Sequence, residues 1–138
     1  MTAFDLEFIL VRRAALRRSV KYEDSIFFHV GDAQDLPFRD ASFDAVVNFG
    51  IIHHLEDWGK GIGEIVRVLV PNGLFYFEEI YPPLYANFLF RRLVAHPTEN
   101  RFYGEEFRAG LSAKGLRLRS GFKENRFGIL GVAQKDDA

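Results

Sequence analysis

Short apolar runs alternate with amphipathic stretches along this chain. Two runs stand out: Ile26–Val30, which Gly31-Asp32 closes, and Phe43–Phe49. Their apolarity is continuous rather than alternating, which is typical of strands covered on both faces of a sheet. The short segment that leads into Asp5 is interpreted as the end of a further strand. The pattern therefore predicts buried strands in a mostly parallel sheet.

The clearest helix is predicted between Trp58 and Leu69. Its apolar residues fall at helical spacing and form one stripe, and Asp57 occupies the N-cap position. Pro71-Asn72-Gly73 is predicted to stop this helix and to turn the chain into a strand over Leu74–Phe77. The stripe consists of Trp58, Ile62, Ile65, Val66 and Leu69.

Three further helices are predicted from the polar and apolar spacing. They are expected over Phe8–Ser19, from Pro82-Pro83 to about Val94, and after Gly104 as far as Lys114-Gly115. In the last of these, Glu105 and Glu106 lie at the positive end of the helix dipole.

A hairpin is predicted to follow these helices at the end of the chain. Leu116–Phe122 and Phe127–Ala133 read as two antiparallel strands joined by the polar turn Lys123-Glu124-Asn125. Strands and helices that alternate and then end in a hairpin predict the α/β class. The expected architecture is an open, doubly wound, mostly parallel sheet with an antiparallel C-terminal edge, in a single domain over residues 1–138.

Composition excludes several kinds of chemistry. The 138 residues contain no cysteine, so disulfides, thiolate metal sites and cysteine nucleophiles are absent. A net charge of −1 gives no basic footprint for nucleic acid, and no apolar run reaches the roughly 18 residues of a membrane span. We therefore expect a cytoplasmic protein with no nucleic-acid partner and no stable membrane insertion. The 15 phenylalanines indicate a bulky core, an apolar pocket or an interaction surface.

Five stretches follow one another in the order and spacing of a known family. They resemble the class I S-adenosylmethionine (SAM)-dependent methyltransferases, and within them the branch of the ubiquinone/menaquinone-biosynthesis (type 11) methyltransferases. The resemblance implies a Rossmann-like fold with the strand order 3-2-1-4-5-7-6 and SAM as cofactor. The stretches are Gly31–Phe38, Ser42–Val47, Ile52–Asp57, Glu64–Leu69 and Pro71–Leu74, and Gly104–Phe107 and Lys114–Leu116 extend the likeness towards the C-terminus.

The resemblance assigns roles to particular residues. Asp5 matches the acid that accepts hydrogen bonds from the cofactor ribose, and Asp32 and Ala33 match the pair that reads the adenine. For Asp32 the alternative is an Asx turn after Gly31. For Asp5 the alternative is a frayed, solvent-exposed acid near the N-terminus.

A second group of residues follows the strand Phe43–Phe49. The resemblance implies that the backbone of Asn48, Phe49 and Gly50 approaches the methionine end of the cofactor. His53 and His54 lie beside the expected point of methyl transfer and are the candidate catalytic residues. The alternative is that the pair begins a helix, with one ring buried and one solvated. Adjacent histidines have the wrong spacing for two ligands on one helix face, so no metal site is expected.

The family's first strand and its glycine-rich loop precede the position of Asp5 and have no counterpart here. Gly59-Lys60-Gly61-Ile62-Gly63 contains a glycine pattern, but it falls inside the predicted helix and is interpreted as a weak helix start. Absence of the first, central strand would expose two strand edges, which favours a homodimer. The sequence thus predicts an N-terminally truncated, SAM-dependent methyltransferase domain that acts on a small-molecule or lipid-like acceptor. The alternative functions are a catalytically inactive fragment that serves as a binding or dimerisation module, and a peripheral membrane contact through Tyr81–Arg92.

Overall fold

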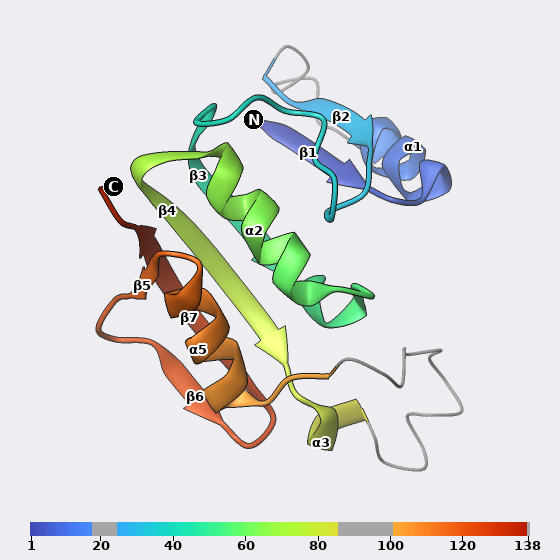
Figure 1. Ribbon diagram of the computed structural model, residues 1–138. Helices are drawn as coiled ribbons and strands as arrows, with labels where there is room; N and C mark the ends of the chain where they lie inside the picture. The colour runs from blue at the N-terminus through green and yellow to red at the C-terminus, as the bar shows by residue number, and fades with distance from the viewer. Residues whose placement is uncertain (18–24, 86–100, 138) are drawn as a thin grey trace. The chain divides into compact units, whose positions relative to one another are not determined.

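The computed structural model describes residues 1–17, 25–85 and 101–137 (Figure 1). The chain divides into two compact units, Met1–Pro37 and Phe38–Ala138, and each unit is described here by itself. The single domain expected over residues 1–138 stays a prediction.

The first unit is a βαβ arrangement. Strand β1 (Thr2–Asp5) leads into helix α1 (Phe8–Arg17), and strand β2 (Phe27–Val30) pairs with β1 in parallel. Both predicted strands form, but the burial predicted for the apolar runs is wrong. Phe27 and Val30 of β2 are 60% and 48% exposed, and the only buried residue of the strand over residues 43–49 is the polar Asn48. Helix α1 has no buried residue, in keeping with apolar positions that do not gather on one face. The predicted helix extended to Ser19, and residues 18–24 lie outside the described part of the chain.

The second unit contains a mixed sheet in the order β3-β4-β7-β5, with β6 also paired to β7. Strands β3 and β4 are parallel, whereas β5 and β6 both run antiparallel to β7, as β7 does to β4. The strands are β3 (Phe43–Phe49), β4 (Leu69–Ile80), β5 (Leu116–Leu118), β6 (Lys123–Asn125) and β7 (Gly128–Lys135).

Helices connect these strands and confirm much of the sequence prediction. Helix α2 (Trp58–Val68) begins after Asp57, whose side chain accepts a hydrogen bond from the Lys60 backbone N–H at 2.9 Å. The glycine pattern of residues 59–63 lies within this helix, as predicted. The other helices are η2 (Ile52–His54), α3 (Pro82–Tyr85) and α5 (Gly104–Ala113). The helix predicted to reach Val94 falls largely on residues 86–100, which lie outside the described residues.

Two predicted boundaries were wrong. The strand expected over Leu74–Phe77 extends from Leu69 to Ile80, and the predicted turn is an irregularity inside β4, where Asn72 adopts a positive φ of 63°. The register of β4 against β3 shifts there, so that pairing resumes on both sides of the irregularity. The strand can therefore continue past a segment that reads locally as a turn.

The C-terminal hairpin also differs from its prediction. Lys123–Asn125, expected as the turn, forms strand β6 and pairs with β7. The turn lies after it, because the Asn125 side chain accepts a hydrogen bond from the Phe127 backbone N–H at 2.7 Å and closes the chain there.

The core of the second unit lies between its sheet and the helices α2 and α5, which are seen on the same side of the sheet in Figure 1. Phenylalanines supply much of it, and Phe107 packs edge-on against Phe77 with ring centroids 5.4 Å apart. The opposite face is different. Val47, Phe49 and Leu130 are exposed there, and a groove of about 500 Å³ runs over these strands. Of the 15 phenylalanines, Phe75, Phe77, Phe102 and Phe107 lie in the core of this unit.

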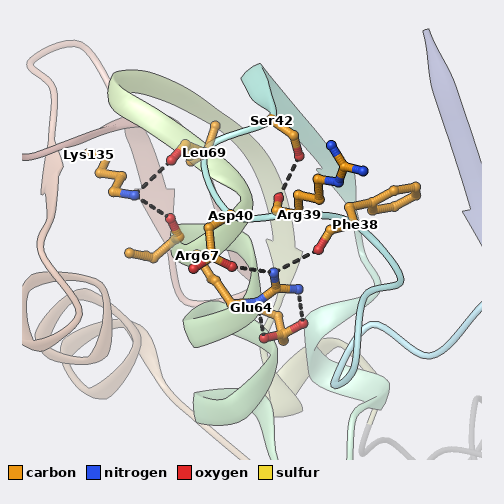
Figure 2. A network of polar contacts seen from close by, with 9 residues as sticks. Phe38, Arg39, Asp40, Ser42, Glu64, Arg67, Leu69 and Lys135 are labelled. Carbon is orange, nitrogen blue, oxygen red and sulfur yellow. Dashed lines mark hydrogen bonds and ion pairs between the residues drawn. The ribbon is translucent and has the colours of Figure 1, made fainter.

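Ion pairs hold the chain where β3 and β4 begin (Figure 2). Arg67, near the end of α2, donates to both carboxylate oxygens of Glu64 and to the carboxylate of Asp40, each at 2.7 Å, and to the carbonyl of Phe38. These hydrogen bonds raise the pKa of the Arg67 guanidinium. Lys135 of β7 donates to the carbonyls of Val66 and Leu69, which end the helix. Arg67 therefore attaches α2 to the loop that enters β3, and Lys135 attaches the end of α2 to β7.

Candidate functional site

In the first unit, Asp5 and Asp32 follow neighbouring parallel strands. Asp5 ends β1 and lies opposite Val30 of β2, and its carbonyl accepts a hydrogen bond from the Gly31 backbone N–H at 3.0 Å. Asp32 comes next in the chain, so both acids stand at the carboxyl edge of the same strand pair. In parallel α/β sheets this edge is where ligands bind.

The carboxylates of both acids also shape the local backbone. Asp32 Oδ1 accepts from the Gln34 backbone N–H at 2.8 Å and from the Gln34 side-chain amide at 3.3 Å, which is the Asx turn considered from the sequence. Asp5 Oδ1 accepts from the Glu7 backbone N–H at 2.9 Å. Within the described residues, neither Oδ2 accepts a hydrogen bond from the chain. One oxygen of each acid thus holds the turn, and the second can meet a ligand. Ala33, half-buried, lies in the same turn as Asp32.

In the second unit, the corresponding edge is the end of β3. Asn48 is buried with 7% of its surface exposed, whereas Phe49 is 68% exposed. Gly50 turns the chain with a φ of +63°, a conformation that favours glycine, and its backbone N–H donates to the Glu78 carbonyl at 2.7 Å. The three residues that resemble the methionine-end segment therefore form a defined reversal at the carboxyl end of a parallel strand.

A buried acid that the sequence analysis did not single out lies beside this reversal. The side chain of Glu79, near the end of β4, is fully buried, and its Oε1 accepts from the Asn48 side-chain amide at 2.5 Å and from the Ile52 backbone N–H at 2.9 Å. Its Oε2 lies 3.3 Å from the His53 backbone N and 2.7 Å from His53 Nδ1. The sequence Phe77-Glu78-Glu79-Ile80 contains a signal for this buried acid. Successive side chains of a strand point to opposite faces of the sheet, so one of two adjacent glutamates faces the core.

The two histidines differ in their surroundings. His53 is buried at 6% exposure and contacts Glu79, whereas His54 is exposed. Their ring centroids lie 4.2 Å apart. This distribution, one ring buried and one solvated at the start of a short helix, matches the alternative weighed from the sequence. A catalytic role for either ring stays a prediction.

A second polar cluster lies just beyond β4. Tyr81 donates its hydroxyl hydrogen to Glu124 Oε1 at 2.8 Å, and Arg108 of α5 pairs with the other oxygen of Glu124. Burial and the hydrogen bond to Glu124 raise the pKa of the Tyr81 phenol well above its ordinary value. The cluster joins α5 to strand β6 and to the end of β4.

Over the described ranges of the chain, no set of three or more histidine, aspartate or glutamate side chains is grouped as a metal site would require. Within these same ranges no helix has the length and apolarity needed to cross a membrane.

Comparison with known proteins identifies the family. A family model described as a methyltransferase domain matches residues 1–77, more than half of the chain. The chain belongs to the class I SAM-dependent methyltransferase family. The resemblance seen in the sequence is therefore confirmed, and so is the predicted Rossmann-like α/β class with an antiparallel edge.

Individual relatives agree with the family. The chain is 44% identical over 59 residues to a demethylmenaquinone methyltransferase of Deinococcus radiodurans, which covers 43% of this chain and 24% of the relative. It is 43% identical over 50 residues to the norajmaline N-methyltransferase of Rauvolfia serpentina, over 36% of this chain and 17% of the relative. The chain thus spans about a quarter or less of the length of these curated relatives.

Solved structures have a similar fold. A SAM-dependent methyltransferase from Methanosarcina mazei superposes with a TM-score of 0.77 at 22% identity, covering 99% of this chain and 82% of that one. At this sequence identity the structural similarity shows the fold alone.

The strand order also follows the family. The order β1-β2 corresponds to family strands 2 and 3, and β3-β4-β7-β5 corresponds to family strands 4, 5, 7 and 6.

Proposed function

We propose that this chain is a SAM-binding methyltransferase domain that acts on a small-molecule or lipid-like acceptor. The observation that carries the proposal is the placement of Asp5 and Asp32 at the carboxyl edge of one parallel strand pair, each with an oxygen available to a ligand. Family membership supports it, and so do relatives named for norajmaline and demethylmenaquinone.

The residues fit the cofactor by their chemistry. A carboxylate accepts hydrogen bonds, so Asp5 suits the ribose hydroxyls and Asp32 suits the exocyclic amine of adenine. The backbone N–H of Ala33 suits a ring nitrogen of the adenine. In the second unit, the backbone of Asn48, Phe49 and Gly50 is the segment proposed for the methionine end. When bound, SAM supplies an electrophilic methyl group on a sulfonium.

The chain's own contribution to such a reaction is alignment and exclusion of water. Methyl transfer requires the donor and acceptor to be in line, and a base only for acceptors that must lose a proton. We propose His53 and His54 as the candidate groups for accepting such a proton, since the resemblance to the family places both beside the point of methyl transfer.

The test is a calorimetric titration of S-adenosylhomocysteine into the purified chain. Saturable binding is expected, and Asp32→Ala should weaken it by at least about tenfold, which corresponds to about 1.4 kcal/mol. Asp35→Ala is the matched control, because Asp35 is an exposed acid in the same turn. No heat from wild-type protein that is folded by circular dichroism would overturn the proposal.

A second candidate is a dimerisation module. Strand β3 is an edge strand of its sheet, and Val47 and Phe49 on it are 57% and 68% exposed. Apolar edge strands pair with other chains unless they are covered. A dimer in light scattering that Val47→Lys dissociates would favour this candidate, and a monomer at all accessible concentrations would remove it.

A further inference from the structure

We propose that Glu79 is a positioning residue, which fixes the segment from Asn48 to His54 and the tautomer of the His53 ring. The inference rests on the proposed function in one respect, since this segment is the one assigned to the methionine end of the cofactor. Glu79 itself is buried behind the segment and would act through it.

Four nitrogen atoms surround the Glu79 carboxylate. A buried carboxylate is costly unless hydrogen bonds satisfy its lone pairs. Here both oxygens have two nitrogen neighbours each, from the Asn48 side chain, the Ile52 and His53 backbone and the His53 ring. Three of these four nitrogens belong to η2, so the carboxylate chiefly holds that turn.

Helix η2 has no side-chain cap from its own N-cap residue. The first N–H groups of a helix need acceptors, which a Ser, Thr, Asp or Asn at the N-cap commonly supplies. The N-cap of η2 is Ile51, which has no side-chain acceptor, and no side-chain cap bond is made from that position. Glu79 accepts from the Ile52 and His53 N–H groups in its place. The capping group thus comes from a neighbouring strand, which ties the turn to β4.

Asn48 holds the chain reversal that precedes η2. Asn48 is held on both ends of its amide, because Nδ2 donates to Glu79 and Oδ1 accepts from the Ile51 backbone N–H at 3.3 Å. The left-handed Gly50 lies between these two contacts. The amide of Asn48 therefore links the reversal to the same carboxylate.

The Glu79 carboxylate also contacts the His53 ring, with Oε2 2.7 Å from Nδ1. A carboxylate accepts and does not donate, so Oε2 places the ring hydrogen on Nδ1 and leaves Nε2 as the acceptor of the neutral ring. Ring orientation and tautomer are thereby set together.

Glu79→Gln is the informative substitution because it keeps the shape and reverses part of the hydrogen-bond polarity. An amide offers one oxygen and two hydrogens, whereas the Ile52 and His53 backbone N–H groups and the Asn48 amide all approach as donors. Neither backbone N–H can reverse, but the one on Oε1, from Ile52 at 2.9 Å, is shorter than the one on Oε2, from His53 at 3.3 Å. Among these groups, the His53 ring on Oε2 can change from donor to acceptor. The new amide nitrogen should therefore face Nδ1, and the ring hydrogen should move to Nε2.

The first measurement is the ring ¹⁵N spectrum of histidine, with the His53 signals assigned from His53→Gln. The expected result is an Nδ1–H ring in the neutral wild-type protein and an Nε2–H ring in Glu79→Gln. A wild-type ring that carries its hydrogen on Nε2 would overturn the inference without any variant having to fold. This measurement needs no ligand.

The second measurement is S-adenosylhomocysteine affinity. Glu79→Gln should weaken binding by about tenfold or more. The matched control is Glu64→Gln, the same substitution in an ion-paired glutamate near the amino ends of β3 and β4, which should change the affinity by less than about twofold. Wild-type affinity in folded Glu79→Gln would overturn the inference. Failure of the wild-type protein to bind would instead overturn the proposed function, and the ring spectra would still decide whether Glu79 holds His53.

Discussion

The two ends of the parallel strand pair β3-β4 are held by polar networks of opposite character. Where the strands begin, Arg67 joins Glu64 and Asp40 at the surface, with side chains that are 30%, 17% and 79% exposed. Where they end, Glu79 and His53 meet with side chains that are 0% and 4% exposed.

The two networks therefore have different roles. Exposed ion pairs are screened by water and contribute little each, so the first network chiefly secures α2 to a loop. A buried carboxylate is tolerated only in one arrangement of donors, so the second network specifies the path of the backbone. The specified end is also the edge at which parallel α/β sheets bind ligands.

The largest expected effect is the removal of the buried acid. Glu79→Ala should lower the free energy of unfolding by about 3–5 kcal/mol, because four nitrogen groups lose their acceptor inside the protein. Urea unfolding followed by the fluorescence of Trp58, the single tryptophan, measures this in the second unit. A loss below about 1 kcal/mol would mean that the buried network contributes no more to stability than an exposed ion pair.

Removal of the Arg67 guanidinium should destabilise the protein less than removal of Glu79. Arg67→Ala should lower the free energy of unfolding by about 1–2 kcal/mol, since the guanidinium is partly solvated but serves several acceptors. The same urea titration measures it, and S-adenosylhomocysteine affinity should stay within about twofold of wild type. A large loss of affinity at unchanged fold would contradict the assignment of this end to stability.

A pH series sharpens the comparison at the carboxyl end. Tyr81→Phe should cost about 1 kcal/mol at neutral pH by removing the hydrogen bond to Glu124. Since the pKa of Tyr81 is raised on folding, this stability is present below the unfolded pKa of about 10 and is lost as pH rises above it. The difference between wild type and variant should therefore shrink above about pH 10, and a difference that grows there would disprove the direction.

The smallest effect is expected at the most exposed acid. Asp40→Asn should cost a few tenths of a kcal/mol at low salt, because the Asp40 carboxylate is 79% exposed. In about 1 M salt, where the screening length is about 3 Å, the cost should disappear. Comparing urea midpoints at the two salt concentrations tests this, and a cost that survives high salt would show a buried contribution.

The local sequence pattern predicted several elements well, and it failed where strand pairing determines whether a segment is a strand or a turn. Strand β3 and helix α2 agree with their predictions, because one is a continuous apolar run and the other has an apolar stripe with an acidic N-cap. Strand β4 continues through Pro71-Asn72-Gly73, and β6 forms over a segment that reads as a turn. Both depend on hydrogen bonds to partner strands that a local window does not contain.

The site shows the same division. Asp5 and Asp32 were proposed from motif order, and the structure adds that each acid also holds a backbone turn. Glu79 lies 27 residues from Ile52 and 31 residues from Asn48 in the chain. No sequence spacing predicts their contact.

Local pattern and ordered motifs were enough to predict the family, most of the strands and helices in their order, and the acids that follow parallel strands. They did not predict strand β6, nor which of the adjacent Glu78 and Glu79 is buried and which turn it caps; these depend on the tertiary fold. The physical reason is that a buried charge is acceptable only where donors from distant segments converge on it, and folding alone brings those segments together.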